Sequence, residues 1–336
     1  MDKASLSRNV LVTGGAGYIG SHACKALARS GFTPICYDNL SRGHAWAVQW
    51  GPLEQGELLD QARLEDVLHR YKPCAVMHFA ALAYVGESVA EPALYYRNNV
   101  GGSLALLQSM RAAGVRHFIF SSTCATYGIP RRLPMTEAHP QDPINPYGTS
   151  KLMVEKMLMD FSKAYELRSV SLRYFNAAGA DPEGEIGEAH DPETHLIPLA
   201  LKAAAGDLPQ LEIYGDDYDT ADGTCIRDYI HVTDLADAHV KACQYLLDDG
   251  DTTCLNLGNE TGFSVREIID RIENITAKKI NAMISARRPG DPACLVADSS
   301  KIKQVLNWET RHSEIETILS SAWNWYLKHR NREAAQ

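Results

Sequence analysis

The chain has 336 residues, 45% of them hydrophobic, and a formal net charge of −9. This size and composition indicate one large domain or two closely joined ones, and the negative charge disfavours a general nucleic-acid-binding protein. No stretch approaches the roughly 18 apolar residues of a membrane-spanning helix, and the polar segment 1–8 lacks the apolar region of a secretory signal. The eight cysteines show no close paired spacing, which argues against a disulfide framework. We therefore expect a cytoplasmic protein that binds neither nucleic acid nor membrane.

The N-terminal segment has the pattern strand, glycine-rich turn, helix. An apolar strand at 10–13 precedes the turn Gly-Gly-Ala-Gly-Tyr-Ile-Gly at 14–20, and a helix is predicted at 21–28. The glycines let the backbone approach a pyrophosphate, and the helix N-terminus offers free N–H groups to it. A second strand at 33–37 ends at Asp38, whose carboxylate is suited to accept hydrogen bonds from an adenosine ribose. Asp38 favours NAD over NADP, because a 2′-phosphate would meet its negative charge.

Strand and helix patterns then alternate along the first half of the chain. Strands are predicted near 75–79, 117–121 and 169–175, separated by a helix over 94–113 and another that begins at Pro146. Such alternation predicts an α/β fold, a doubly wound parallel sheet of Rossmann type with helices on both faces.

From Asn176 this rhythm loosens into a segment rich in Gly, Pro and acidic residues. We assign residues 1–176 to an NAD-binding domain and residues 177–336 mainly to a smaller α/β substrate-binding domain, with segment 228–258 expected to return to the first. The second domain is predicted to contain helices at 196–205, 265–272 and 314–327 and strands at 211–214 and 280–285. The cleft between the two domains is the default binding site.

Tyr147 and Lys151 lie four residues apart in the helix that begins at Pro146, so their side chains share one face. A nearby ammonium favours the charged form of a phenol, so the pKa of Tyr147 is expected to fall and the residue to act as a general acid and base. The alternative interpretation is a solvated helix face, since a Tyr-x-x-x-Lys spacing also occurs by chance.

Five sequence blocks, in order along the chain, carry a family resemblance. They are TGGAGYIGSH (13–22), SSTCATYG (121–128), PYGTSK (146–151), LRYFNAAGA (172–180) and CIRDYIHVTDLADAH (225–239). Together they resemble the extended short-chain dehydrogenase/reductases and, within them, the UDP-glucose 4-epimerases. The resemblance implies a tightly held NAD that removes hydride from carbon 4 of a UDP-sugar, a 4-keto intermediate that turns over, and return of hydride to its other face. UDP-galactose and UDP-glucose would thereby interconvert.

The resemblance also assigns roles to individual residues. Tyr147 would be the catalytic base, Lys151 would lower its pKa and bind the nicotinamide ribose, and Thr123 would hydrogen-bond the 4-oxygen of the sugar or relay its proton. The implied cofactor contacts are Gly14, Gly17, Tyr18, Ile19, Gly20, Asp38, Asn39, Glu57, Leu58, Phe79, Ala80, Ala81, Leu82, Asn98, Thr123, Tyr147, Lys151, Tyr174 and Phe175. The implied substrate contacts are Asn176, His195, Leu196, Glu212, Ile213, Tyr214, Arg227, Arg288, Asp291 and Leu295. A homodimer formed through helices near 94–113 and 152–164 is also implied.

Some positions depart from the family pattern. Ala83 replaces a lysine that some members carry near the cofactor, which would weaken cofactor retention. His195 stands where other members carry Asn, and with His190, Asp191 and Glu193 it fits no common ligand spacing, so no metal is expected. Leu295 has the middling size that suggests a hexose substrate and leaves N-acetylated sugars open.

The sequence also bears on three alternative functions. A nucleotide-sugar dehydratase is disfavoured, because Cys124 and Ala125 stand where those enzymes carry an Asp-Glu pair. A UDP-xylose/UDP-arabinose 4-epimerase, or one with dual specificity, stays open because such enzymes share the blocks around Thr123 and Arg227. A non-catalytic NAD-binding sensor is a hypothesis of another class, disfavoured by the intact Thr123, Tyr147 and Lys151.

Overall fold

The computed structural model describes residues 7–288 and 290–333, so most of the polar start lies outside the described residues. Its centre is a seven-stranded sheet in the order β3-β2-β1-β4-β5-β6-β10, with every neighbouring pair parallel. The strands are β1 (Asn9–Thr13), β2 (Thr33–Asp38), β3 (Leu53–Gln55), β4 (Ala75–His78), β5 (His117–Thr123), β6 (Arg168–Tyr174) and β10 (Thr253–Leu257). The predicted Rossmann-type fold class is confirmed.

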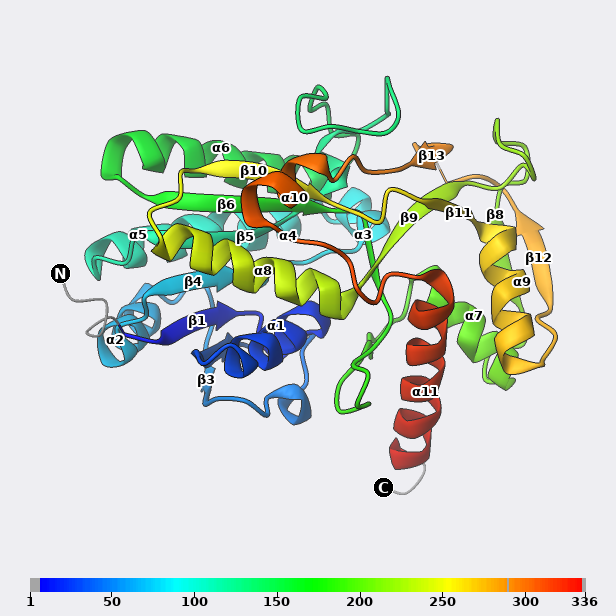
Figure 1. Cartoon of the computed structure of the whole chain (residues 1–336), viewed down its shortest axis with the longest axis horizontal. Helices are drawn as coiled ribbons and strands as arrows, with labels where there is room; N and C mark the ends of the chain where they lie inside the picture. The colour runs from blue at the N-terminus through cyan, green and yellow to red at the C-terminus, as the bar shows by residue number, and fades with distance from the viewer. Residues whose placement is uncertain (1–6, 289, 334–336) are drawn as a thin grey trace.

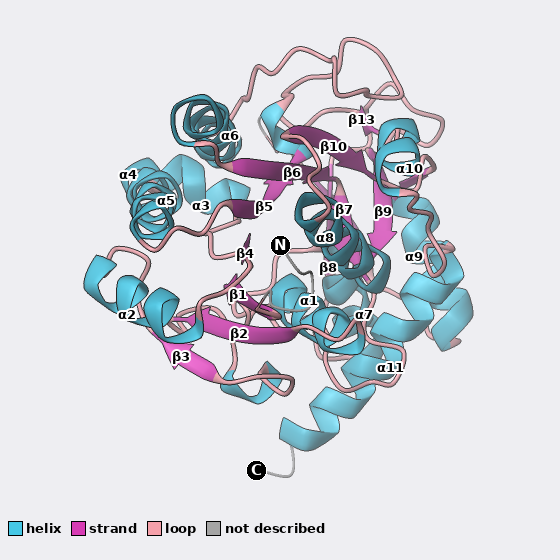
Figure 2. Ribbon diagram, turned by 60° about the vertical axis from the view of Figure 1, so that its left-hand side comes forward, coloured by secondary structure: helices cyan, strands magenta, loops and turns pink. Residues whose placement is uncertain are grey.

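Helices cover both faces of this sheet, as Figure 2 shows. One face carries α1 (Tyr18–Arg29) and α8 (Val232–Leu247), and the other carries α2 (Gln61–Tyr71), α5 (Gly102–Ala112) and α6 (Pro146–Tyr165). Successive side chains of a strand point to opposite faces, so Val10 and Val12 of β1 join the core under α1 and α8. Leu11 joins the core under α2, α5 and α6. Because both faces of the sheet are buried, these strands consist of nearly continuous apolar residues.

A smaller part of the molecule lies beside the large sheet (Figure 1). Its strands are β7 (Asn176–Ala178), β9 (Ile226–His231), β11 (Gly262–Ser264) and β13 (Cys294–Leu295), with β8 (Leu211–Tyr214) and β12 (Ala282–Ser285) forming a separate pair. Helices α7 (Leu196–Ala205), α9 (Val265–Thr276) and α11 (Ile315–Glu333) enclose a third core cluster with β8 and β9. Within segment 228–258, β9 stays on the small sheet, whereas α8 and β10 lie with the large one. The domain boundaries themselves stay a prediction.

The region predicted as one helix over 94–113 is divided. It consists of α4 (Pro92–Tyr95), a π-helical segment (Tyr96–Gly101) and α5, and the short helix α3 (Val85–Ala90) precedes them. Apolar periodicity does not distinguish a π-helical segment from an α-helix, but such segments are frequent at functional sites. Helix α2, the strands β3, β7, β11 and β13, the 3₁₀ turns η2 (Ala45–Ala47) and η4 (Cys124–Thr126), and α10 (Ser300–Leu306) were not predicted. Within the described residues, no helix combines the length and apolarity needed to cross a bilayer.

The acidic loop after β7 is attached to α1 through a buried lysine. Lys25 Nζ lies 2.6 Å from Asp181, 2.8 Å from Glu183 and 2.7 Å from Glu185. The side chains of Lys25 and Asp181 are only 6% and 3% exposed. Removing the cation would leave a buried carboxylate unpaired, which costs far more than losing a surface ion pair.

We therefore expect Lys25→Met to lower the free energy of unfolding by about 3–5 kcal/mol. The control is Arg29→Met, which removes a solvent-exposed ion pair to the same Glu183 and should cost less than about 1 kcal/mol. Urea unfolding followed by circular dichroism measures both values. Equal losses for the two variants would contradict a buried role for Lys25.

Candidate active site

The candidate site lies where the parallel strands of the large sheet end. Gly14 follows β1, Phe79 follows β4, Thr123 ends β5 and Tyr174 ends β6. Chain connections diverge from the centre of the sheet at β1 and β4, and ligands of doubly wound sheets bind outside the carboxyl ends of the strands at such a point. The fold therefore collects residues that are far apart in the sequence.

The glycine turn makes close backbone contacts that only glycine allows. Gly14 has φ +73°, and a Cβ there would lie 2.6 Å from the Ala80 nitrogen. A Cβ at Gly20 would overlap the Gly14 carbonyl oxygen. Helix α1 begins at Tyr18 with Gly17 as its N-cap and no side-chain cap, so backbone N–H groups are available to an anion. These features fit a dinucleotide pyrophosphate.

Asp38, the last residue of β2, is hydrogen-bonded to this turn. Its carboxylate accepts hydrogen bonds from Ala16 N at 3.0 Å and Leu40 N at 2.8 Å, and burial raises its pKa. Asn39 donates to the carboxylate of Glu57 at 3.1 Å. The acceptors expected beside an adenosine ribose are thus held in fixed positions.

The π-helical segment connects the loop after β4 to α6. The Asn99 side chain accepts from Leu82 N at 2.9 Å, donates to Leu82 O at 2.9 Å, and donates to Ser150 Oγ at 3.1 Å. Asn98 donates to the Asn99 side chain at 2.9 Å. Sequence reasoning identified Asn98 and Leu82 but missed Asn99, whose role depends on a contact to a residue 51 positions away.

Helix α6 begins at the centre of the site. Asn145 caps it by accepting from Gly148 N at 2.8 Å, and Pro146 occupies the first turn. A Cβ on Gly148 would overlap the Ala125 carbonyl oxygen, so glycine is required for α6 to lie against the turn after β5. This close approach places Tyr147 near Thr123, whose hydroxyl acts to lower the pKa of the phenol.

Lys151 is buried one turn further along α6. It is 3% exposed, donates from Nζ to Ser121 O at 2.9 Å, and lies 5.9 Å from the centre of the Tyr147 ring. Burial lowers its pKa to about 7. The Tyr174 hydroxyl forms a short hydrogen bond with the side chain of the same Ser121.

The expected lowering of the Tyr147 pKa is not found in the protein alone. Burial raises this pKa above its ordinary value, and the neighbouring Tyr174 raises it further, while the hydrogen bond from Thr123 lowers it. The reason is that burial acts on both partners, so it also removes charge from Lys151 near neutral pH. A buried phenol of this kind needs further positive charge nearby before it can serve as a base.

A buried ion pair between Glu155 and Arg173 connects α6 to β6. Sequence reasoning missed this pair. Glu155 accepts from Arg173 at 2.6 and 2.9 Å and from Ser122 Oγ at 2.5 Å. Arg173 also donates to the Tyr127 hydroxyl at 2.9 Å. No local spacing signals this pair, because Glu155 lies on α6 and Arg173 lies on β6, 18 residues further along the chain.

Four of the predicted substrate residues, Asn176, Arg227, Asp291 and Leu295, lie on or beside β9. Arg227 forms a short ion pair with Asp291, and Leu295 on β13 lies opposite Arg227 in the strand register. The Arg288 guanidinium lies 3.9 Å from the centre of the Tyr214 ring. Asn176 donates to the Asp228 carbonyl at 3.0 Å.

Two residues that were predicted to contact the cofactor or the substrate have side chains buried in the hydrophobic core. Ile213 is 4% exposed in the third core cluster, and Leu58 is 8% exposed under α5. Glu212 is exposed. The individual cofactor and substrate contacts stay predictions.

His195 lies beside two carboxylates rather than in an uncharged setting. Its Nδ1 is 2.9 Å from both Glu188 and Glu193, with Leu196 following directly at the start of α7. Burial lowers the pKa of His195, but the two carboxylates outweigh this effect and raise it to about 10. The cluster therefore attracts positive charge.

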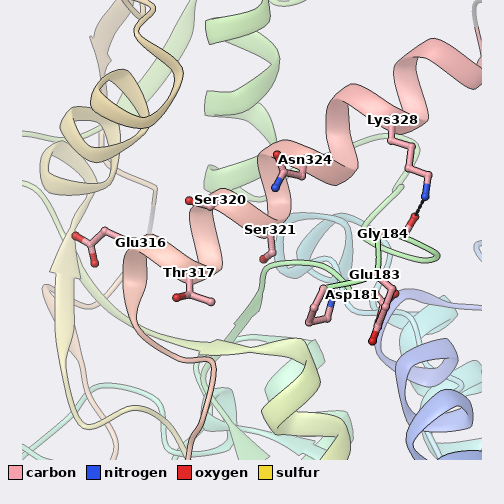
Figure 3. A pocket seen from close by; sticks show the side chains of 10 residues that line it. Asp181, Glu183, Gly184, Glu316, Thr317, Ser320, Ser321, Asn324 and Lys328 are labelled. Atoms are coloured by element: carbon pink, nitrogen blue, oxygen red, sulfur yellow. Dashed lines mark hydrogen bonds between the residues drawn. The ribbon is translucent and has the colours of Figure 1, made fainter.

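A separate hollow lies between the acidic loop and α11 (Figure 3). It has a volume of about 520 Å³ and is lined by Asp181, Glu183, Glu316, Ser320 and other polar residues, with Lys328 donating to Gly184 O at 2.6 Å across it. None of the predicted site residues lines it, so it is not the candidate active site.

The close contact of α6 predicts a severe effect of Gly148→Ala. The added methyl must push α6 away from Ala125 and so separate Tyr147 from Thr123; displacements of about 1 Å at a reacting centre can lower turnover about 100-fold. Gly86→Ala is the control, because a methyl there meets no atom within 4 Å. Steady-state kinetics of both variants measures the effect, and unchanged turnover for Gly148→Ala would refute it.

The lowered pKa of Lys151 predicts a pH-dependent stability in the NAD-free protein. The folded pKa of about 7 lies below the ordinary 10.5, so the unfolded chain binds more protons between these values. Stability due to Lys151 must therefore rise with pH across this window. The difference in unfolding free energy between the native protein and Lys151→Met should therefore increase in favour of the native protein between pH 7 and about 10. Urea unfolding measures this difference. A difference that does not change with pH would contradict a buried, neutral lysine.

Comparison with known proteins bears directly on this geometry. Residues 10–258 match the NAD dependent epimerase/dehydratase family. The chain is 55% identical over 322 residues to a UDP-glucose 4-epimerase of Rhizobium meliloti (strain 1021), covering 96% of this chain and 98% of that protein.

Two solved structures are similar over nearly their whole length. The UDP-glucose 4-epimerase from Brucella ovis in complex with NAD is 56% identical, with a TM-score of 0.93 and coverage of 95% of this chain and 98% of that one. The UDP-glucose-4-epimerase from Stenotrophomonas maltophila with bound NAD and formylated UDP-arabinopyranose is 40% identical, with a TM-score of 0.93 and coverage of 98% and 99%. These matches confirm the resemblance inferred from the sequence blocks. The chain belongs to the NAD-dependent epimerase/dehydratase family.

Proposed function

We propose that this protein is an NAD-retaining epimerase that interconverts UDP-galactose and UDP-glucose by inverting carbon 4 of the sugar. The observation that carries the proposal is the junction of Thr123, Tyr147 and Lys151 at the carboxyl ends of β5 and β6, beside a glycine turn that fits a dinucleotide. High identity to proteins named UDP-glucose 4-epimerase supports it.

Bound NAD⁺ would supply a hydride acceptor and return the same hydride to the opposite face of a 4-keto sugar. In this proposal Tyr147 takes the proton from the 4-hydroxyl group and later gives it back. Thr123 holds the reacting oxygen next to the phenol through its own hydroxyl, which can both donate and accept. The positive charge of NAD⁺, together with Lys151, would offset the burial that raises the pKa of Tyr147 in the protein alone.

The substrate side offers the groups that a nucleotide diphosphate requires. Arg227 and Arg288 carry guanidinium groups that pair bidentately with phosphate oxygens. In the absence of nucleotide, Arg227 is paired with Asp291 and Arg288 lies over Tyr214. Binding would exchange these contacts for contacts to the diphosphate. Leu295, on the strand next to that of Arg227, would border the sugar.

A pentose substrate is a second candidate. The solved structure of a similar UDP-glucose-4-epimerase holds formylated UDP-arabinopyranose, so that protein accommodates a modified pentose nucleotide. The dehydratase and sensor interpretations gain no support, because Cys124 and Ala125 are not acids and the three catalytic candidates lie together.

We also propose a homodimer and a cytoplasmic location. Exposed apolar side chains lie on α4, α5 and α6, the helices on which the expected dimer depends; they are Leu94, Leu104, Met153 and Met159. Burying them against a second copy would remove an apolar surface from water. Analytical ultracentrifugation measures the oligomeric state.

Tyr147→Phe should lower turnover by about 10²–10⁴-fold while bound NAD is retained, because only the proton-transferring hydroxyl is lost. Tyr165→Phe, at the far end of α6, is the matched control and should leave turnover unchanged. Initial rates and the absorbance of NAD in the purified variants measure both properties. Normal activity of Tyr147→Phe would rule out the proposed base.

The decisive assay is product analysis with no cofactor added. The purified protein is incubated separately with UDP-galactose, UDP-N-acetylgalactosamine and UDP-arabinopyranose. Formation of UDP-glucose is expected from the first substrate. Conversion of the pentose alone would move the assignment to the second candidate, and inactivity with all three, even after NAD is added, would favour a binding protein.

A further inference from the structure

Segment 188–195, which leads into α7, folds back on itself and gathers four potential metal ligands. The donor atoms of Glu188, His190, Glu193 and His195 all lie within 4.8 Å of one another. The two carboxylate side chains are 9% and 4% exposed, whereas those of His190 and His195 are 22% and 49% exposed. The carboxylates therefore form the interior of the cluster, and the imidazoles cover it.

The donor atoms are close enough to converge on one ion after side-chain movement. His190 Nδ1 lies 3.1 Å from Glu188 Oε1 and 3.8 Å from Glu193 Oε2. His195 Nδ1 lies 2.9 Å from the nearest oxygen of each glutamate, and all the donor atoms lie within 4.8 Å of one another. Zinc bonds of about 2.0–2.2 Å place neighbouring tetrahedral ligand atoms about 3.3–3.6 Å apart. Binding would therefore separate the nearest donor atoms slightly and bring the more distant ones together.

The charge of the ligand set matches a divalent cation. With the neutral imidazoles that metal binding requires, the four side chains carry two negative charges, and burying these without a cation would be costly. The neighbouring cation, Arg42, forms an ion pair with Glu87 at 2.8 Å and stacks on the Tyr84 ring at 5.2 Å. It contacts the segment through the backbone carbonyl of Asp191 at 3.3 Å. Arg42 is thus engaged elsewhere, and a doubly charged ion would neutralise the cluster.

We propose that Glu188, His190, Glu193 and His195 bind a Zn²⁺ ion in a four-coordinate structural site. Imidazole and carboxylate groups are both zinc ligands, and four protein ligands make a closed site without an open catalytic position. Binding requires unprotonated imidazoles, so metal affinity should fall as the pH is lowered.

The position of the cluster indicates what the ion would do. The His190 ring meets Tyr18 edge-on at 6.2 Å and Tyr84 edge-on at 6.0 Å. Tyr18 opens α1 directly after the glycine turn, and His195 precedes the first residue of α7. The ion would fix the entry to α7 against the glycine turn and the loop after β4. This inference does not depend on the proposed epimerase activity.

The test is metal content and uptake by the full-length protein after removal of any affinity tag. Protein stripped with EDTA is dialysed against Zn²⁺ and then against metal-free buffer, and zinc is counted by inductively coupled plasma mass spectrometry. We expect the native chain to retain a single equivalent, and His190→Gln and Glu193→Gln to lose it. His69→Gln, an exposed histidine of α2, is the matched control and should retain it.

Cobalt provides a readout that does not depend on the variants folding. Co²⁺ added to the stripped native protein should give the intense visible absorption of four-coordinate cobalt, and Zn²⁺ should abolish it. A native protein that retains no zinc and gives no such absorption overturns the proposal, leaving the cluster as a hydrogen-bonded ion pair. Equal zinc retention by native protein and the folded variants His190→Gln and Glu193→Gln would also overturn it.

Discussion

The position of helix α6 against β5 and β6 depends on the buried ion pair between Glu155 and Arg173. Glu155 lies on the helix, Arg173 on β6, and Ser122, which donates to the same carboxylate, on β5. Because both charged side chains are almost fully buried, any shift of the helix would leave one of them uncompensated. The pair thus holds α6 in the single position where Tyr147, Lys151 and Thr123 meet.

Burial of this arrangement has an electrostatic consequence. The same enclosure that fixes Lys151 lowers its pKa, and it raises the pKa of Tyr147. Simple Coulomb reasoning on two residues of one helix predicts the opposite shift for the tyrosine, because it omits the loss of hydration. The proton chemistry of this pair is therefore a property of the complete site with its charged ligand, and not of the spacing of the two residues.

Buried charged side chains also attach the smaller part of the molecule to the large sheet and its helices. Asp228 on β9 accepts from the backbone of Asn259 at 2.7 Å, Glu260 at 3.1 Å and Ala297 at 3.1 Å, which joins β9 to the segments that follow β10 and β13. Lys25 attaches the acidic loop to α1 through its ion pair with Asp181. These contacts hold β9 and β13 next to the large sheet, where Leu295 packs against a cluster that contains Cys124 and Phe175, the residues that follow β5 and β6.

Much of the fold was predictable because local signals were strong. Apolar runs marked most of the parallel strands, Pro146 marked the start of α6, and the predicted bounds of α7 and β8 match the structure. The short elements β3, β7, β11 and β13 were not predicted, since strands of two or three residues are formed by pairing with distant partners and carry little periodicity of their own. The π-helical segment around Asn98 was missed because apolar periodicity does not distinguish it from an α-helix.

The sequence by itself determined the glycine turn, the acid after β2, the helix that carries Tyr147 and Lys151, and the family to which these blocks belong. Each of these is a local pattern whose residues act within a few positions of one another. Only the tertiary structure decided the burial of Lys151, the pairing of Glu155 with Arg173, and the convergence of Glu188, His190, Glu193 and His195. Burial and pairing between distant elements arise when the whole chain excludes water, which no local spacing records.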